Sequence, residues 1–277
     1  MKEFFTAERK IFPSVFRVLI GLILLIDLVY MYRASSIFLN PELNSFLPTD
    51  KISEFITQNS GFFFLFYGLI LILFIFGLFR NLISFLVFCC YLILFHLSYQ
   101  FVTWGDIMLK FTLLFFVFAD SFRYLSLNRT KGSYSFISVL AVWSIILHVF
   151  MVYLNNAYFK LEDRHWQRGF AVYYSFAQYA QFPDSIFHCP VSNSFFSKSI
   201  DYFIIFQQLL FVPMVIWKRT RYFMLILALV IHLTMMVQFG LWKFELAVVL
   251  QFGFLLNDEE LRRLMPSKFR LKYFLAE

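Results

Sequence analysis

The residues with the clearest capacity for chemistry lie within positions 148–174, where a long apolar segment runs into a single lysine. This lysine is Lys160, and it is followed by Trp166, Gly169 and an aromatic stretch that includes Tyr173. Burial at the foot of a membrane helix disfavours the charged form of an ammonium group and so lowers its pKa. An uncharged amine can accept a proton, which a solvated lysine rarely does at neutral pH. We therefore interpret Lys160 as a candidate general base.

A second interpretation of Lys160 needs no catalysis. A lysine at the end of a membrane helix often extends its ammonium group to the interface, where a neighbouring tryptophan also prefers to lie. Lys160 and Trp166 fit this description as well as they fit an active site. Composition alone favours this interfacial anchor over a base.

Polar side chains inside the other apolar segments are further candidates, because in a bilayer they need a partner or a purpose. Four of them are candidates for lining a substrate site, namely Arg17, Asp27, Asp106 and His148. His232 is a candidate catalytic residue. Asp106 precedes Lys110 by four residues, an order that favours a helical ion pair, so a structural role is the simpler interpretation for Asp106. The histidines occur on different segments without ligand spacing, and no metal site is predicted.

The composition indicates an integral membrane protein. The chain has 277 residues, of which 61% are hydrophobic and 15% are charged. Soluble domains average about 45–50% apolar and about 25% charged residues. The net charge of +7 is carried mostly by short loops, as expected beside a membrane, and no nucleic-acid partner is predicted.

The hydrophobic pattern predicts an all-α, polytopic membrane helical bundle with about eight transmembrane helices, because a span needs about 20 apolar residues. The expected spans are 14–32, 62–79, 82–101, 105–122, 135–157, 200–217, 221–239 and 242–256. They form one transmembrane domain, 1–256, with two long loops at 33–61 and 159–199. The first apolar segment lacks a small-residue cleavage site and is expected to stay as a helix. Residues 257–277 read as an amphipathic tail.

The distribution of lysine and arginine predicts the orientation. Most of the 24 basic residues fall on one side of the expected bundle, together with both termini. The positive-inside rule makes that side cytoplasmic. Both long loops and Lys160 are then expected on the outer face.

The three cysteines give no metal or thioredoxin-type motif. Cys89 and Cys90 are neighbours in an apolar segment and read as small buried residues. Cys189 stands alone in the loop 159–199, and a redox role at the outer face remains an alternative for it.

The segment around Lys160 resembles the signature of a known family. The pattern is Lys160-Leu161, four residues, Trp166, two residues, Gly169, then Ala171-Val172-Tyr173-Tyr174. It is similar to the HTTM family, the membrane domains related to vitamin K-dependent gamma-carboxylase. Three weaker similarities support this resemblance. They are the pair Arg17 and Asp27, the dipeptide Gly105-Asp106, and His232 followed by Gly240.

The resemblance implies a function. In the carboxylase branch the lysine at this position deprotonates vitamin K hydroquinone, which makes Lys160 the expected base and vitamin K hydroquinone or another quinol the expected cosubstrate. His232, Asp27 and Trp166 would line the site. The carboxylases, which are lyases, also carry a large extramembrane portion that engages the protein substrate. The present chain is more similar to the compact bacterial members, such as sporulation-delaying toxin maturation proteins, which implies the bacterial inner membrane and a secreted peptide as client.

Two other function classes remain open from the sequence. The outer loops 33–61 and 159–199 could bind a secreted peptide or toxin without catalysis, as a maturation factor would. A transporter is less favoured, because paired discontinuous helices are not evident in the sequence.

Overall fold

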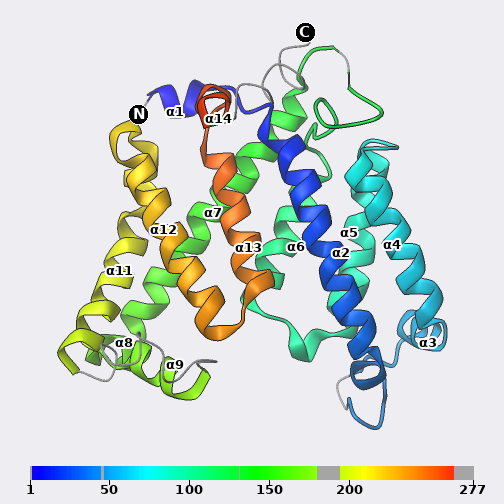
Figure 1. Ribbon diagram of the computed structural model, residues 1–277, viewed down its shortest axis with the longest axis horizontal. Helices are drawn as coiled ribbons and strands as arrows, with labels where there is room; N and C mark the ends of the chain where they lie inside the picture. The colour runs from blue at the N-terminus through cyan, green and yellow to red at the C-terminus, as the bar shows by residue number, and fades with distance from the viewer. Residues whose placement is uncertain (1, 45–46, 131, 180–193, 265–277) are drawn as a thin grey trace. The chain divides into compact units, whose positions relative to one another are not determined.

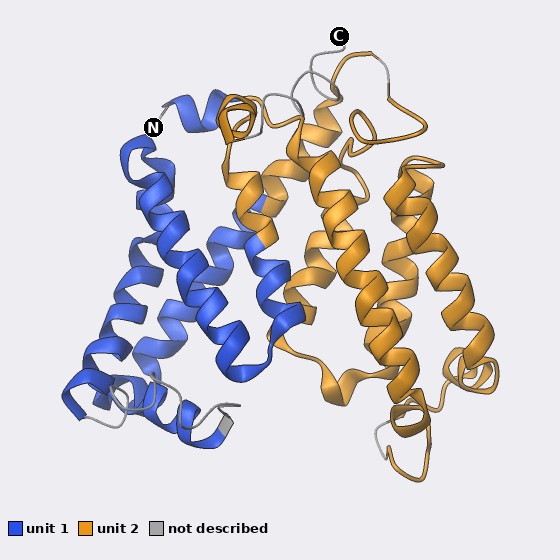
Figure 2. Cartoon of the chain, in the orientation of Figure 1, with its two compact units in different colours: residues 1–7, 146–249 blue, residues 8–145, 250–277 orange. Residues whose placement is uncertain are grey.

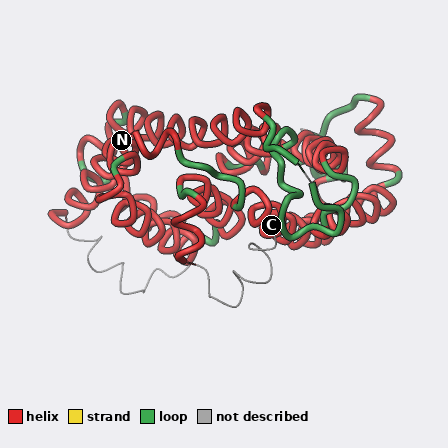
Figure 3. The backbone as a smooth tube through the Cα atoms, turned by 90° about the horizontal axis from the view of Figure 1, so that it is seen from above, coloured by secondary structure: helices red, strands yellow, loops and turns green. Residues whose placement is uncertain are grey.

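The computed structural model describes residues 2–44, 47–130, 132–179 and 194–264. Within these ranges the chain is helical and contains no strand (Figures 1 and 3). The all-α expectation is therefore confirmed for the described residues. The longer elements are α2 (Phe12–Phe38), α4 (Ser60–Phe76), α5 (Asn81–Leu97), α6 (Trp104–Phe116), α7 (Phe136–Glu162), α11 (Ser194–Ile216), α12 (Lys218–Phe239) and α13 (Trp242–Gln251). The shorter ones are α1 (Lys2–Thr6), α3 (Lys51–Gln58), α8 (Arg164–Arg168), α9 (Ala171–Tyr179) and α14 (Asp258–Leu264), with 3-10 turns η1 (Tyr99–Phe101) and η2 (Phe252–Leu255).

Several helices are long and apolar enough to cross a membrane, which indicates an integral membrane protein. In the described part of the chain, α2, α7, α11 and α12 meet this description. A fifth span is present if α3 and α4, which meet at a bend of 92°, are taken together. Each expected span overlaps one helix, but α5 has 17 residues, α6 has 13 and α13 has 10. Because about 20 residues cross a bilayer, eight crossings stay a prediction.

The chain forms two compact units, shown in Figure 2. Unit 1 contains residues 1–7 and 146–249, and unit 2 contains residues 8–145 and 250–277. The boundary falls within α7 and within α13, so both helices contribute to both units. The expectation of a single transmembrane domain, 1–256, stays a prediction.

In unit 2, α2 packs against α4, α4 against α5, and α5 against α6. A buried arginine near the start of α2 fastens the segment that follows α6. Arg17 has no exposed surface, and its guanidinium donates to the carbonyl oxygen of Ser121 at 2.6 Å and to that of Leu125. Its charged group also lies 4.9 Å from the ring centre of Phe122. These contacts fix the loop that begins after Phe116, where α6 ends after only 13 residues.

The charged helix α14 caps the start of α2 within unit 2. The Asp258 carboxylate accepts hydrogen bonds from the backbone N–H groups of Lys10, at 2.9 and 3.0 Å, and Ile11, at 3.0 Å. The carboxylate thereby satisfies backbone donors that precede the first turn of α2. The tail expected at 257–277 thus begins as a helix, and its residues beyond 264 lie outside the described ranges.

In unit 1, α11 packs against α12, α8 and α9. Asp201 on α11 is fully buried and accepts hydrogen bonds from the N–H groups of Ala171, at 2.9 Å, and Val172, at 3.0 Å, at the start of α9. Gly169 joins α8 to α9 with a φ of +79°, and a Cβ there would lie 2.7 Å from the Cα of Lys198. Only glycine tolerates both constraints. The Gly169 of the Lys–Trp–Gly pattern therefore has a structural role.

Candidate functional site

A buried hydrogen-bonded chain links three helices of unit 1. The hydroxyl of Tyr153 on α7 lies 2.8 Å from Nε2 of His232 on α12. The other ring nitrogen, Nδ1, hydrogen-bonds the carboxylate of Glu245 on α13. Tyr153 and Glu245 are buried, at 4% and 1% exposure, and the ring of Tyr153 stacks on Phe211 of α11 with centroids 3.6 Å apart.

One placement of the protons satisfies both hydrogen bonds. In it the carboxylate of Glu245 accepts the Nδ1–H of His232, and Nε2 accepts the hydroxyl proton of Tyr153. A carboxylate that orients a histidine, which in turn holds a hydroxyl group, is the arrangement that proton-transferring enzymes use. The chain Tyr153–His232–Glu245 can therefore hold or move a proton inside an apolar interior.

Lys160 lies on the same helix as Tyr153, seven residues further along. Seven residues are close to two turns, so both side chains point to the same face of α7, about 10 Å apart along its axis. Lys160 is half-buried. Its Nζ lies 4.8 Å from the ring centre of Trp166 on α8, within the range of a cation–π contact. The structure thus places Lys160, Trp166 and His232 in one unit.

Trp166 also belongs to a small apolar cluster that α9 forms with α11 and α12. It packs against Val172 and Phe176, together with Ile200, Ile204 and Phe239. Tyr173 is 37% exposed, and its ring contacts that of Tyr174. The aromatic segment that follows Gly169 thus forms a packed helix beside the lysine, with tyrosines on its exposed side. His148 is half-buried on α7, three turns before Lys160, and its place in a site stays a prediction.

Arg17 and Asp27 belong to unit 2 and have neighbours there. The contacts of Arg17 with Ser121 and Leu125 are those of a structural residue. Asp27 is half-buried on α2 and interacts electrostatically with the hydroxyl groups of Tyr67 and Tyr91. The expected contact of Arg17 and Asp27 with a substrate stays a prediction.

Asp106 has a clear local role. Its carboxylate accepts hydrogen bonds from the N–H of Thr103 at 2.9 Å and from its hydroxyl at 2.8 Å, which completes a capping box at the start of α6. The hydroxyl of Tyr91 also donates to it at 3.2 Å. Lys110 has its ammonium 4.4 Å from the ring centre of Phe95. These contacts give Asp106 a structural role as a helix cap, and its expected ion pair with Lys110 stays a prediction.

Sequence reasoning did not select two members of the buried chain, Tyr153 and Glu245, as site residues. Glu245 carried a signal, because it is a carboxylate inside an expected span. Tyr153 carried a weaker one, its position two turns before Lys160. Cys189 lies outside the described residues.

Comparison with known proteins adds no relative. No family model, no curated protein and no solved structure matches the chain. In the described part of the chain, no group of three or more His, Cys, Asp or Glu side chains is placed to hold a metal ion. The resemblance to the HTTM family thus rests on the sequence pattern alone. The structure indicates an integral membrane protein, with a cluster of ionisable side chains in unit 1.

Proposed function

We propose that this protein is a membrane enzyme of acid–base chemistry that acts on a lipophilic acidic substrate, with a quinol as the favoured class. The observation that carries the proposal is the buried chain Tyr153–His232–Glu245 on the face of α7 that also presents Lys160. Buried ionisable groups are costly in a membrane protein and usually mark a functional site. The resemblance of the Lys–Trp–Gly pattern to the HTTM family points to the same lysine.

The side chains present suit a hydroquinone. A hydroquinone, when bound, would supply an acidic hydroxyl group on an aromatic ring. Lys160 would accept the hydroxyl proton at Nζ, and the ammonium so formed would be stabilised by the face of Trp166. The pair His232 and Glu245 would keep the hydroxyl of Tyr153 oriented for a second proton transfer. Apolar surroundings strengthen each of these interactions by excluding water.

The proposed topology has eight crossings, with both termini in the cytoplasm and Lys160 towards the outer face of a bacterial inner membrane. The excess of basic residues on the side of the termini supports it. In this topology a reactant dissolved in the bilayer reaches Lys160 from the outer leaflet, and an exported peptide would be the acceptor of the chemistry.

The proposal is tested by the ionisation of a bound hydroquinone. Purified protein in detergent is mixed with vitamin K hydroquinone without oxygen at neutral pH, and the phenolate absorbance is recorded. We expect a phenolate signal with the wild type that is absent without protein. The signal should be lost in Lys160→Ala, and also in Lys160→Arg because a guanidinium does not give up its proton.

Lys198→Ala is the matched control, because Lys198 also lies over an aromatic ring, that of Tyr202, in unit 1. It should retain the phenolate signal. Gel filtration and circular dichroism report whether each variant is folded. A folded Lys160→Ala variant with full phenolate signal would contradict the proposal, as would an equal loss in Lys198→Ala.

A second candidate function is the non-catalytic binding of a secreted peptide or toxin. It is favoured by the exposed aromatic side chains of the α8–α9 segment, Phe170, Tyr173 and Tyr174. Exposed aromatic residues are common anchors in peptide interfaces. Retained binding of the natural client by Lys160→Ala, with loss of binding in Tyr174→Ala, would favour this function.

A further inference from the structure

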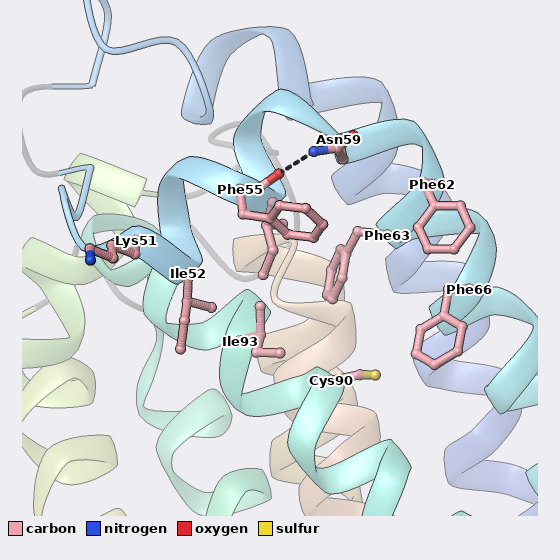
Figure 4. A pocket seen from close by; sticks show the side chains of 10 residues that line it. Lys51, Ile52, Phe55, Asn59, Phe62, Phe63, Phe66, Cys90 and Ile93 are labelled. Carbon is pink, nitrogen blue, oxygen red and sulfur yellow. Dashed lines mark hydrogen bonds between the residues drawn. The ribbon is translucent and has the colours of Figure 1, made fainter.

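A groove in unit 2 lies apart from the chemistry proposed above, and its assignment does not rest on that proposal. It has a volume of about 480 Å³ and is formed by α3, the start of α4 and α5. Ligand pockets commonly span about 300–1,000 Å³. Figure 4 shows its lining, with Lys51 towards one end and Phe66 and Cys90 towards the other.

The lining is apolar except for Lys51 at one end and the amide of Asn59. Phe63 and Cys90 form the buried side of the groove, at 8% and 4% exposure, whereas Ile52 and Phe62 are largely exposed along its edges. The amide of Asn59 is turned onto the chain and donates to the carbonyl oxygen of Phe55 at 2.8 Å. An open, apolar groove of this kind suits a flexible hydrocarbon chain.

The charged end of the groove defines the headgroup. Lys51 is exposed and forms no ion pair within the described residues. The neighbouring carboxylate of Asp50 is already engaged, by the hydroxyl of Ser53 at 2.6 Å and by Nε2 of His96 at 3.1 Å. An exposed ammonium beside an apolar groove matches an anionic phosphate followed by an acyl chain.

The bend between α3 and α4 places these features at the right depth. The two helices meet at 92°. If α4 enters the bilayer, α3 then runs along the interface, where a lysine reaches the headgroups. We propose that this groove binds one acyl chain of an anionic phospholipid, with the lipid phosphate held by Lys51.

The first test measures lipid selectivity. Delipidated protein in detergent is supplied with equal amounts of phosphatidylglycerol and phosphatidylcholine, and bound lipid is counted by native mass spectrometry. We expect the wild type to retain phosphatidylglycerol several-fold better than phosphatidylcholine. Lys51→Ala should abolish this preference, whereas Arg33→Ala, which removes an exposed cation elsewhere in unit 2, should keep it. Equal binding of the two lipids by the wild type, or equal losses in the two variants, would overturn the proposal.

The second test locates the acyl chain. The sequence has three cysteines, so the double variant Cys89→Ala/Cys189→Ala leaves Cys90 as the single thiol. Phosphatidylglycerol should slow alkylation of Cys90 by a lipophilic maleimide, and Ile93→Trp, which fills the groove, should remove that effect. Unchanged alkylation of Cys90 in the presence of the lipid would contradict the assignment. Protection by a quinone or an apolar peptide, but not by the phospholipid, would contradict it as well.

Discussion

At the scale of the residue, the charged side chains inside the apolar segments divide by the partners they contact. Arg17, Asp106 and Asp201 bind backbone or capping groups and hold the chain in place. His232 and Glu245 hydrogen-bond each other, and His232 also hydrogen-bonds the side chain of Tyr153. The first group has structural roles, and the second forms the cluster on which the proposed chemistry depends.

The role of Arg17 leads to a prediction on stability. Arg17→Met removes two charge-assisted hydrogen bonds to the carbonyl oxygens of Ser121 and Leu125. Hydrogen bonds to charged groups contribute about 1.5–3 kcal/mol each. We expect a clearly lower thermal unfolding midpoint in detergent for this variant. Arg33→Met, an exposed position on the same helix, should unfold like the wild type, and similar midpoints for the two variants would refute the structural role.

At the scale of the element, short helices are fixed at their N-terminal ends by carboxylates. Asp163 caps α8, Asp201 caps α9 and Asp50 caps α3. The first and third can be read from the sequence, because Asp precedes each helix directly. The cap of α9 cannot, because Asp201 lies thirty residues away along the chain. Such long-range caps appear only when the packing of α11 against α9 is known.

The cap of α3 gives a pH prediction. The Asp50 carboxylate accepts hydrogen bonds from the hydroxyl of Ser53, from the N–H of Ser53 and from His96. These bonds, of which that from the Ser53 hydroxyl has the largest effect, hold the pKa of Asp50 below its ordinary value. A carboxylate with a depressed folded-state pKa contributes stability above its unfolded pKa of about 4, and this contribution is lost as the pH falls. We expect the amides of residues 51–58 to lose protection against exchange, relative to the intrinsic rate at each pH, below about pH 4.

Asp50→Asn is the matched variant for this prediction, since asparagine also caps a helix but does not titrate. Its exchange at 51–58 should lack the acid step. An acid step of the same size in Asp50→Asn would show that another group causes it.

At the scale of the whole molecule, the sequence predicted the helical class and one helix for each expected span. It could not give the lengths of these helices. The start of α6 is marked locally by the capping box of Thr103 and Asp106. Its end at Phe116 is followed by a segment that Arg17 binds, which is a contact between residues far apart in the sequence. The sequence also indicated Lys160, Trp166 and His232 but missed Tyr153, since a tyrosine in an apolar segment is ordinary until its partner is known.

The reactivity of one amine tests the central claim most directly. A lipid-soluble amine reagent, phenyl isothiocyanate, is applied briefly at neutral pH, and the modified lysines are identified by mass spectrometry. Only an uncharged amine reacts, so Lys160 should be modified ahead of Lys198, the exposed lysine over Tyr202, and a hydroquinone analogue should protect Lys160 alone. If Lys160 instead reacts no faster than Lys198, with or without the analogue, it is a charged anchor and not a base.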